Sequence, residues 1–530
     1  MISAIIACFV IGYVVIVFEH PLRLDKTVPA LLMGAICWAL ISLGFNGGSL
    51  NIVDGHEHLF TLSHEIMEVL KAAIAAGGAD EQLIQAFTQA IAQVPDLVPE
   101  IQTEYVHRFE ETLHHMQEMG TAMTGANIET AFHHTNEEGF GNNLLHHLGK
   151  TAEILIFLIG AMTIVEIVDL HRGFDIIKGW ISTRSKKKLL WIVGALGFIL
   201  SAIIDNLTAT IVLVTLLRKL VPNREERLWY VALIVIAANA GGAWSPIGDV
   251  TTTMLWIGKR VTTAGLMEYL IVPSLVCFIV PFVIASYMKP FQGNLLSPEL
   301  ESEEGVDDST ERLLSSRTML FLGLGMIVFV PIFKTITHLP PYIGMMLSLG
   351  VVWLVSEYIH PEEEFTEDRK EIYSAHKALS RIEMSSILFF LGILMAVAAL
   401  ETIAIGNVGA LRAVADQLRA VIPNQDIVIF ILGFLSAIID NVPLVAASMG
   451  MYDIKVFAED DKLWHFIAYS AGTGGSMLII GSAAGVAAMG MERIDFIWYF
   501  KKIAWLAFLG FAAGAAVFLL IENFFNPISG

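Results

Sequence analysis

Cysteine and positive charge are both scarce in this sequence. The three cysteines, Cys8, Cys37 and Cys277, lie in apolar runs and lack the spacing of a metal site or a disulfide framework. They are interpreted as small buried side chains. Lysine and arginine total 32 against 52 acidic residues, and no basic domain exists. Binding to nucleic acid is therefore not expected.

The sequence also lacks a motif that pairs a nucleophile with a base, so an enzyme is not expected and no cofactor is implied. It is 55% hydrophobic with a mean hydropathy of +0.65, which is typical of a polytopic membrane protein. The run from Met1 to Val17 lacks the basic start and cleavage site of a signal peptide, so we expect a first membrane helix there. Without an Arg/Ser-rich transit sequence, a bacterial cell (inner) membrane is favoured over an organelle.

Long apolar runs predict an all-α fold, because a helix needs about 20 residues to cross a hydrocarbon core of ~30 Å. Eight runs are uninterrupted, namely 2–18, 28–46, 150–169, 266–288, 318–336, 340–358, 385–404 and 503–525. Two further runs, 228–258 and 463–490, contain glycine-rich motifs. These two predict broken helices, since glycine lets the backbone unwind and lets another segment approach closely.

One hexapeptide, Ser-Ala-Ile-Ile-Asp-Asn, occurs at 201–206 and again at 436–441. A carboxylate at the centre of a membrane helix costs roughly 2.5–3.5 kcal/mol, so a second copy indicates a function. The apolar arms beside the copies are short, at 189–204, 207–217, 426–439 and 442–452. We therefore expect two re-entrant helical hairpins with Asp205–Asn206 and Asp440–Asn441 at their tips. The alternative is an aspartate that caps the start of a helix.

Other landmarks are duplicated as well. Glu166 and Glu401 each lie 35 residues before the first serine of a hexapeptide. The glycine-rich motifs share one spacing, with Gly241, Gly242 and Gly248 in the first and Gly474, Gly475 and Gly481 in the second. Paired interruptions of this kind are typical of transporters built from two repeats. The alternatives are helix packing through small residues for the glycines and a span-end position near the headgroups for the glutamates.

Lysines and arginines in short loops indicate the orientation. Lys186–Lys188 and Arg218-Lys219 flank the first hairpin, so its feet should be cytoplasmic. The second hairpin is flanked by a more acidic sequence, so its feet should lie outside. The two repeats, of about five spans each, should therefore have inverted topology, and both chain termini should be extracytoplasmic.

These patterns divide the chain into six parts. They are the first two spans (1–50), an extracytoplasmic His-rich acidic helical insert (51–149), the transport core of repeat 1 (150–288), a cytoplasmic linker (289–317), the scaffold spans of repeat 2 (318–358) and the transport core of repeat 2 (385–525). The insert holds ten of the sixteen histidines, including His56, His58, His114, His115, His133 and His134. Helical spacing predicts two or three amphipathic helices there. Exposed histidines are preferred to a metal site, which stays the alternative.

Polar side chains gather at the interruptions of the membrane helices. They are Ser201, Asp205, Asn206 and Thr208 at the first tip, Ser436, Asp440 and Asn441 at the second, Ser245 and Asp249 in the first glycine-rich break, and Ser476 and Ser482 in the second. Oxygen ligands with net negative charge suit a hard cation such as Na⁺ or Li⁺ and would repel an anion. No other metal is assigned. A buried carboxylate can also carry a proton, which is a role open to Glu166 and Glu401.

Three segments together resemble the NhaD sodium–proton antiporters of a wider ion-transporter superfamily, namely 160–166 (GAMTIVE), 201–210 (SAIIDNLTAT) and 241–249 (GGAWSPIGD). The resemblance implies secondary exchange of Na⁺ and Li⁺ for H⁺, with the two Asp-Asn tips at the site. Competition between cation and proton for Asp205 and Asp440 would make the exchange obligatory in an alternating-access mechanism. A sodium-coupled carrier of an organic or inorganic anion is the alternative. The expected partners are membrane lipid and monovalent cations, and a homodimer is left open.

Overall fold

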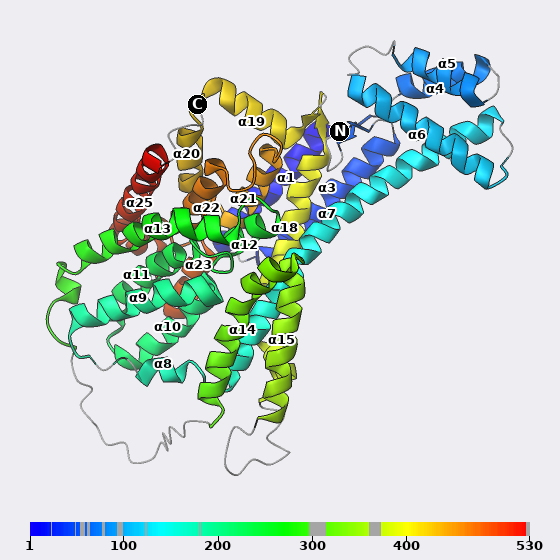
Figure 1. Cartoon of the computed structure of the whole chain (residues 1–530). Helices are drawn as coiled ribbons and strands as arrows, with labels where there is room; N and C mark the ends of the chain where they lie inside the picture. The colour runs from blue at the N-terminus through cyan, green and yellow to red at the C-terminus, as the bar shows by residue number, and fades with distance from the viewer. Residues whose placement is uncertain are drawn as a thin grey trace. The chain divides into compact units, whose positions relative to one another are not determined.

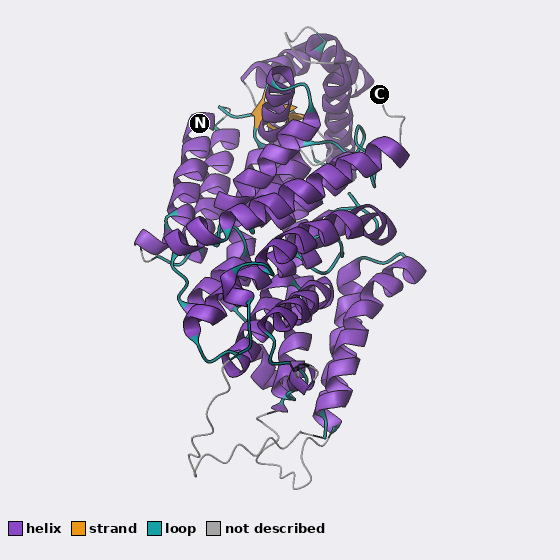
Figure 2. Ribbon diagram, turned by 90° about the vertical axis from the view of Figure 1, so that its left-hand side faces the viewer, coloured by secondary structure: helices purple, strands orange, loops and turns teal. Residues whose placement is uncertain are grey.

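The described part of the protein is mostly helical (Figures 1 and 2). The computed structural model describes the whole chain except residues 23, 48, 54–58, 61–63, 77–79, 93–98, 122–123, 180, 182, 296–313, 360–372, 407 and 526–530. In this described part, four strands of two residues each form two small antiparallel pairs, β1 (Ile52–Val53) with β2 (Leu59–Phe60) and β3 (Ala404–Ile405) with β4 (Val408–Gly409). Figure 2 shows how small a part of the molecule the strands make up.

Among the described residues, seven helices are long and apolar enough to cross a membrane. They are α3 (Thr27–Asn46), the part Phe140–Leu170 of α7 (Gly125–Leu170), α9 (Lys186–Ile204), α13 (Thr263–Ala285), α14 (Ser316–Thr337), α18 (Met384–Thr402) and α25 (Ala504–Phe525). Shorter apolar helices are α1 (Ile2–Val17) and α21 (Asn441–Met451). The prediction of an all-α polytopic membrane protein is therefore confirmed.

The first arm of the first predicted hairpin is longer than the sequence pattern indicated. Helix α9 begins at Lys186, where Ser185 caps it, and includes the lysines that the pattern left outside. Its 19 residues span ~28 Å at 1.5 Å per residue, close to the full hydrocarbon core. The prediction of a short 16-residue arm is wrong, because the basic residues continue the helix instead of ending it.

The chain folds into two compact units. Unit 1 comprises Met1–Ala152, Leu388–Val421 and Gly450–Tyr452. In this unit α1 packs against α3, and the insert contributes α4 (His64–Ala76), α5 (Asp80–Ile91) and α6 (Pro99–Glu118). The unit also contains the short α2 (Glu19–Leu22), the first part of α7, most of α18 and the amphipathic α19 (Ala410–Val421).

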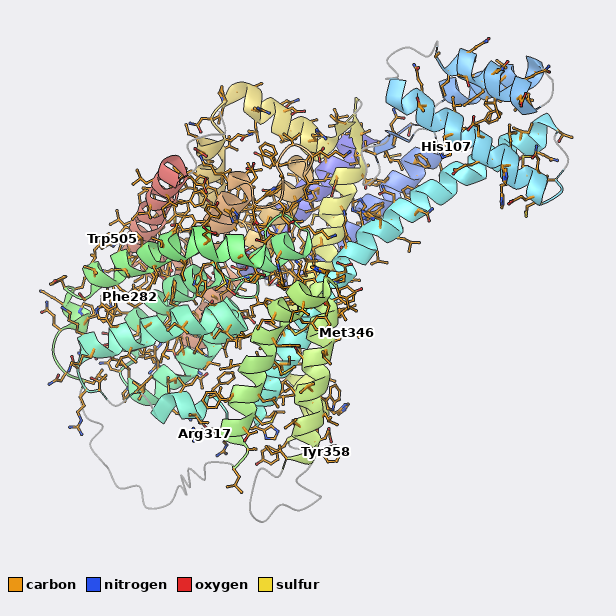
Figure 3. The ribbon with its side chains drawn as sticks, in the orientation of Figure 1. His107, Phe282, Arg317, Met346, Tyr358 and Trp505 are labelled. Atoms are coloured by element: carbon orange, nitrogen blue, oxygen red, sulfur yellow. The ribbon has the colours of Figure 1, made fainter. Side chains whose placement is uncertain are left out.

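The insert has a hydrophobic core of its own. The rings of Phe87, Phe109 and Phe132 meet with centroids 4.6 to 6.1 Å apart, and each side chain is fully buried. His107 on α6 is labelled in Figure 3 and is exposed, with Glu110 and Glu111 beside it. The last helix of the insert is the first part of α7, which continues without a break into the span. The expected boundary at residue 149 therefore falls inside one continuous helix.

Unit 2 comprises Glu153–Ile387, Ile422–Met449 and Asp453–Gly530. Its further helices are α8 (Asp175–Gly179), α10 (Asn206–Leu220), α11 (Arg224–Gly242), α12 (Val250–Ile257), the 3₁₀ helix η1 (Lys289–Phe291), α15 (Pro341–Tyr358), α17 (Ala375–Arg381), α20 (Gln425–Ile438), α22 (Lys462–Gly474), α23 (Ala483–Glu492) and α24 (Phe496–Lys502). Helix α13 packs against α25, and α14 packs against α15.

Side chains of these helices differ in exposure, and four of them are labelled in Figure 3. Phe282 on α13 is 1% exposed and lies at Gly194 of α9, where a larger residue would collide with its ring. Met346 and Tyr358 on α15 are 55% and 77% exposed, and Trp505 on α25 is also exposed. Apolar side chains that point outward are what a lipid-facing surface requires.

Candidate functional site

The first hairpin turns at a single residue. Asp205 ends α9 and precedes α10 with φ 76°, a left-handed value that aspartate tolerates better than most residues. Its side chain caps α10, because Oδ1 accepts the Thr208 N–H at 2.8 Å and Oδ2 accepts the Thr208 hydroxyl at 2.9 Å. The capping alternative is thus part of the geometry at this tip, where Asp205 is also half-buried in an apolar segment.

The second hairpin turns at Ile439 and Asp440, between α20 and α21. Asp440 Oδ1 accepts the N–H of Val442 at 3.3 Å, a looser version of the cap made by Asp205. Asn441 is the first residue of α21 and is 3% exposed, as is Asn206, the first residue of α10. The two Asp-Asn pairs therefore occupy equivalent positions at helix starts.

Each predicted broken helix is interrupted at its glycine motif. Helix α11 ends at Gly242 and α12 begins at Val250, with Asp249 as its N-cap. Helix α22 ends at Gly474 and α23 begins at Ala483, with Ser482 as its N-cap. The aspartate in the first half of the chain therefore has a serine as its counterpart in the second half.

The two hexapeptide serines hold the broken helices in the same way. Ser201 Oγ donates to the carbonyl of Ala238 at 2.5 Å, and Ser436 Oγ donates to the carbonyl of Ala471 at 2.6 Å. Because each serine is fully buried, each bond fixes one hairpin arm to the first half of its own broken helix.

The glycines are required by close backbone approach at the same place. A Cβ on Gly248 would lie 2.8 Å from the carbonyl oxygen of Ser201, and one on Gly481 would lie 2.6 Å from that of Ser436. The other four motif glycines are equally confined, with Gly241 against Phe198, Gly474 against Gly433, Gly242 against Gly248 and Gly475 against Gly481. A side chain at Gly241, Gly248, Gly474 or Gly481 would push a hairpin arm away from its broken helix, and one at Gly242 or Gly475 would open the break itself.

Both hairpin tips meet on one carboxylate. Nδ2 of Asn206 donates to Oδ2 of Asp249 at 3.0 Å, and Nδ2 of Asn441 donates to the same oxygen at 3.1 Å. The backbone N–H of Thr251 donates to Oδ1 at 3.1 Å. Asp249 is 2% exposed, so the two halves of the chain share a buried carboxylate.

A residue that the sequence patterns missed completes this cluster. Asn239, in the last two turns of α11, accepts from Asn206 at 3.0 Å and donates to the hydroxyls of Ser476 and Ser482, both at 2.9 Å. It links the first tip to the second broken helix. The sequence did contain a signal for Asn239, because it is an amide in an apolar run, two residues before Gly241. The equivalent position of the second motif is Gly472, so the duplication did not point to it.

The electrostatics of Asp249 follow from its neighbours. Its described donors are two side-chain amides and one backbone N–H, all neutral. Asp205 and Asp440 lie close enough to act on it electrostatically. A buried carboxylate without a basic partner is costly, so this environment favours a bound cation or a bound proton at Asp249.

The remaining predicted site residues, Ser245, Glu166 and Glu401, make other contacts. Ser245 lies in the first break, where its hydroxyl accepts the N–H of Ile247 at 3.4 Å. Glu166 pairs with Arg381 at 3.0 Å and lies four residues before the end of α7. Glu401 lies one residue before the end of α18, close to the position that a Cβ on Gly450 would take. Both glutamates therefore lie near the C-terminal ends of their helices, at Leu170 and Thr402.

The histidines of the insert were the candidate metal ligands. Within the part of the chain that the structure describes, no group of three or more His, Cys, Asp or Glu side chains could hold a metal ion. His114 and His115 on α6 are exposed. The side chains of His56, His58, His133 and His134 lie outside the described residues.

Comparison with known proteins gives the family. The family model described as "Citrate transporter" matches residues 13–459. Sodium/proton antiporter 1 of Arabidopsis thaliana is 49% identical over 381 residues, which are 72% of this chain and 64% of the relative. Sodium/proton antiporter 2 of the same plant is 45% identical over 72% of this chain and 88% of the relative.

A bacterial relative matches at lower identity over a similar length. The Na(+)/H(+) antiporter NhaD of Alkalimonas amylolytica is 32% identical over 406 residues, which are 71% of this chain and 79% of the relative. The family match, residues 13–459, includes both hexapeptides and the first glycine motif. The chain therefore belongs to the citrate transporter family, and its relatives include sodium/proton antiporters of the NhaD type.

Proposed function

We propose that this protein is a secondary antiporter that exchanges Na⁺, and also Li⁺, for H⁺ across a membrane. The observation that carries the proposal is Asp249, a buried carboxylate that receives hydrogen bonds from both hairpin tips and from no basic group among its described contacts. Relatives at up to 49% identity are named sodium/proton antiporters, which supports the same activity.

The chemistry of exchange follows from the charge of this site. The hydrogen-bond donors of Asp249 are neutral, so either a proton or a cation can balance its charge, and one carboxylate does not bind both fully at the same time. Asn206 links Asp249 to Asn239, which in turn bonds Ser476 and Ser482, so further oxygens belong to the same network. Oxygen is the ligand that hard cations prefer. Asp205 and Asp440 add negative charge that favours the cation. Each proton released therefore makes room for a cation.

Alternating access by two inverted repeats is the mechanism that we propose for the movement. Helix α12 packs against α22, and α23 packs against α11, so the second half of each broken helix lies on the first half of the other. The matched bonds of Ser201 and Ser436 support an internal repeat. The two re-entrant hairpins and the two breaks would then close the site from opposite sides in turn.

A sodium-coupled anion carrier is the second candidate, because the matching family model is described as a citrate transporter. A citrate site needs positive charge or a ring of N–H donors. Among the described contacts of the cluster there is no lysine or arginine, and three aspartates lie near one another. Sodium-dependent uptake of labelled citrate by the purified protein in vesicles would favour this alternative.

We propose that the protein lies in the cytoplasmic membrane of a bacterium, surrounded by lipid, with both chain termini outside the cell. A homodimer is left open. Because two of the relatives come from a plant, a plant membrane is the competing location. Reporter fusions at each terminus test the orientation.

The antiport proposal is tested in everted vesicles from a host without its own sodium/proton antiporters. After respiration acidifies the interior, added Na⁺ or Li⁺ should release protons and raise the internal pH. K⁺ added in parallel measures the ion preference. No response to Na⁺ or Li⁺ between pH 7 and 9.5 would contradict the proposal.

A further inference from the structure

Three helices that meet at the proposed cation site also meet at a second polar cluster. Helices α10 and α11 both pack against the short half-helix α23 (Figure 1). At the site, Asn206 of α10 bonds Asn239 of α11, and Asn239 in turn bonds Ser482, the N-cap of α23. At their other ends the same helices meet at Glu492, the last residue of α23. The three helices are therefore joined at both ends.

Glu492 is a buried carboxylate with an arginine partner from each neighbouring helix. Its side chain is 2% exposed. Nε of Arg218, in the last turn of α10, donates to Oε1 of Glu492 at 2.7 Å. Nη2 of Arg227, in the first turn of α11, donates to Oε2 at 2.9 Å. Each carboxylate oxygen therefore has its own charged donor. We call Glu492, Arg218, Arg224 and Arg227 the Glu492 cluster.

The arginines of the cluster also hold the backbone at the end of α23. Arg218 donates to the carbonyl of Met491, and Arg224 donates to the carbonyls of Glu492 at 2.8 Å and Arg493 at 3.0 Å. Positive charge beside the last carbonyls of a helix is stabilising, because that end carries partial negative charge. Arg493 then turns the chain with φ 50°. The C-terminal end of α23 is therefore fixed to both α10 and α11.

The sequence of α23 explains why Glu492 points towards its neighbours. Ala484, Ala488 and Glu492 are buried and follow one another at intervals of four residues, so they lie on one face of the helix. A helix of ten residues is too short to be stable without contacts to other parts of the protein. The position of α23 therefore depends on its bonded ends, Ser482 at the site and Glu492 at the cluster.

The distance between site and cluster is similar along all three helices. Within each helix the two residues are ten or twelve positions apart, namely Asn206 and Arg218 on α10, Arg227 and Asn239 on α11, and Ser482 and Glu492 on α23. At 1.5 Å per residue these separations are ~15–18 Å, about half of a hydrocarbon core of ~30 Å. A site near the middle of the core would then have the Glu492 cluster near one membrane surface, where charged side chains cost little.

We propose that Glu492 is a positioning residue for the cation site, through which α10 and α11 hold α23 in register. This register keeps the hydroxyl of Ser482 within reach of Asn239. The proposal rests on the proposed function, because it takes the hydrogen-bond network of Asp249 as the cation site. Removal of the Glu492 carboxylate frees the C-terminal end of α23. Because so short a helix moves as one piece, the bond at its N-terminal end is lost as well, and Na⁺ binding weakens.

The test compares Glu492→Gln with the unchanged protein at pH 8.5. Apparent Na⁺ affinity is measured on purified protein in detergent, from the rise in unfolding temperature that Na⁺ causes in each variant relative to the same variant without Na⁺. Choline replaces Na⁺ at constant ionic strength, because ion pairs respond to salt. We expect an affinity roughly fivefold weaker, the effect of losing one hydrogen bond such as that between Asn239 and Ser482.

A double-mutant cycle separates positioning from a general loss of stability. Ser482→Ala removes the hydroxyl that accepts from Asn239 and should also weaken Na⁺ binding roughly fivefold. If Glu492 acts through this hydroxyl, Glu492→Gln has no further effect once Ser482 is alanine, and the double variant is also roughly fivefold weaker than the unchanged protein. Independent effects would instead multiply to roughly 25-fold.

Glu226→Gln is the matched control at the same end of α11. Oε1 of Glu226 accepts from Nζ of Lys186 at 2.6 Å, and both side chains are partly buried. This ion pair joins α11 to α9 rather than to α23, so its loss should lower the unfolding temperature without changing Na⁺ affinity. Glu492→Asp keeps the charge on a shorter side chain and should weaken Na⁺ binding less than Glu492→Gln does.

Na⁺ binding by Glu492→Gln at the affinity of the unchanged protein would overturn the proposal. Multiplied losses in the double variant, or an equal loss of affinity in Glu226→Gln, would also overturn it. If Glu492→Gln yields no folded protein, Glu492→Asp takes its place in the cycle: a loss of affinity that disappears in the Ser482→Ala background supports the proposal, and any other result contradicts it. The proposed function fails separately, if the unchanged protein gives no Na⁺ response in vesicles.

Discussion

Nδ2 of Asn441 lies 3.1 Å from Oδ2 of Asp249, so the hairpin tip of the second half of the chain bonds the broken helix of the first half. Asn206 reaches the same oxygen from the first hairpin at 3.0 Å. The two duplicated Asp-Asn pairs therefore converge through their asparagines, and the carboxylate that they share belongs to a glycine-rich break. This arrangement makes Asp249 the centre of the proposed exchange.

Asn239→Ala should raise the Na⁺ concentration for half-maximal exchange by roughly 10-fold or more. The change removes one bond to Asn206 and two to Ser476 and Ser482, and each buried hydrogen bond contributes about 1 kcal/mol. The measurement is a Na⁺ titration of the vesicle response at pH 8.5. A half-maximal concentration equal to that of the unchanged protein would show that these bonds do not shape the cation site.

Asp205→Asn and Asp440→Asn should reach the membrane at normal levels and should lose most exchange. Asparagine caps helices as well as aspartate does, so the bonds to Thr208 and Val442 can persist while the charge is lost. Immunoblots of the membrane fraction measure the amount, and the vesicle response measures exchange. Wild-type rates in either variant would assign that aspartate to capping alone.

Glu166→Gln should leave the pH profile of exchange unchanged. Its carboxylate is 27% exposed and pairs with Arg381 near the end of α7, away from the described contacts of Asp249. A half-exposed ion pair contributes about 1 kcal/mol or less, so a small loss of thermal stability is the expected effect. A shift of the half-maximal pH in the vesicle assay would restore Glu166 as a proton-carrying residue.

His171 should make the protein less stable in acid. It lies just beyond the span Phe140–Leu170, fully buried, with Nδ1 2.8 Å from the hydroxyl of Ser315 and Nε2 3.0 Å from that of Ser356. Burial lowers the pKa of His171 to about 4. The neutral form is thus favoured in the folded protein, and its contribution is fully present above about pH 6.5, the ordinary histidine pKa.

As the pH falls from about 6.5 towards 4, the unfolded chain binds a proton that the folded protein excludes, and up to about 3 kcal/mol of stability is lost. Unfolding temperatures in detergent at pH 7.5 and 5 measure this loss. His171→Gln keeps donors and acceptors for the two serines and should show a smaller drop. An equal drop in both proteins would assign the acid sensitivity to other groups.

The hairpin turns and the helix breaks could be predicted because the motifs that form them occur twice in the sequence. The identical hexapeptides at 201–206 and 436–441 indicated matched hairpins, and Ser201 and Ser436 do make equivalent bonds to Ala238 and Ala471. The glycine motifs indicated breaks, and α11 and α22 do end at Gly242 and Gly474. A local sequence pattern was sufficient to predict these features, because turns and breaks depend on the backbone geometry of a few neighbouring residues.

The contacts between the two halves of the chain could not be predicted in this way. Asn239 bonds Ser476 and Ser482, but nothing in its own helix indicates a partner more than 230 residues away. The depth of Glu166 depends on where α7 ends, and an apolar run does not fix that point to within a turn. The sequence also did not indicate that α7 is one continuous helix, because its first part is amphipathic and its second part is apolar.

The most direct measurement is the vesicle response of Asp249→Asn. The substitution keeps the size of the side chain and an oxygen that can accept from Asn206 and Asn441, and it removes the charge that cation and proton would share. With the variant present in the membrane at the level of the unchanged protein, we expect no change of internal pH on addition of Na⁺ or Li⁺ at any pH from 7 to 9.5. Exchange by Asp249→Asn at the rate of the unchanged protein would contradict a mechanism centred on this carboxylate.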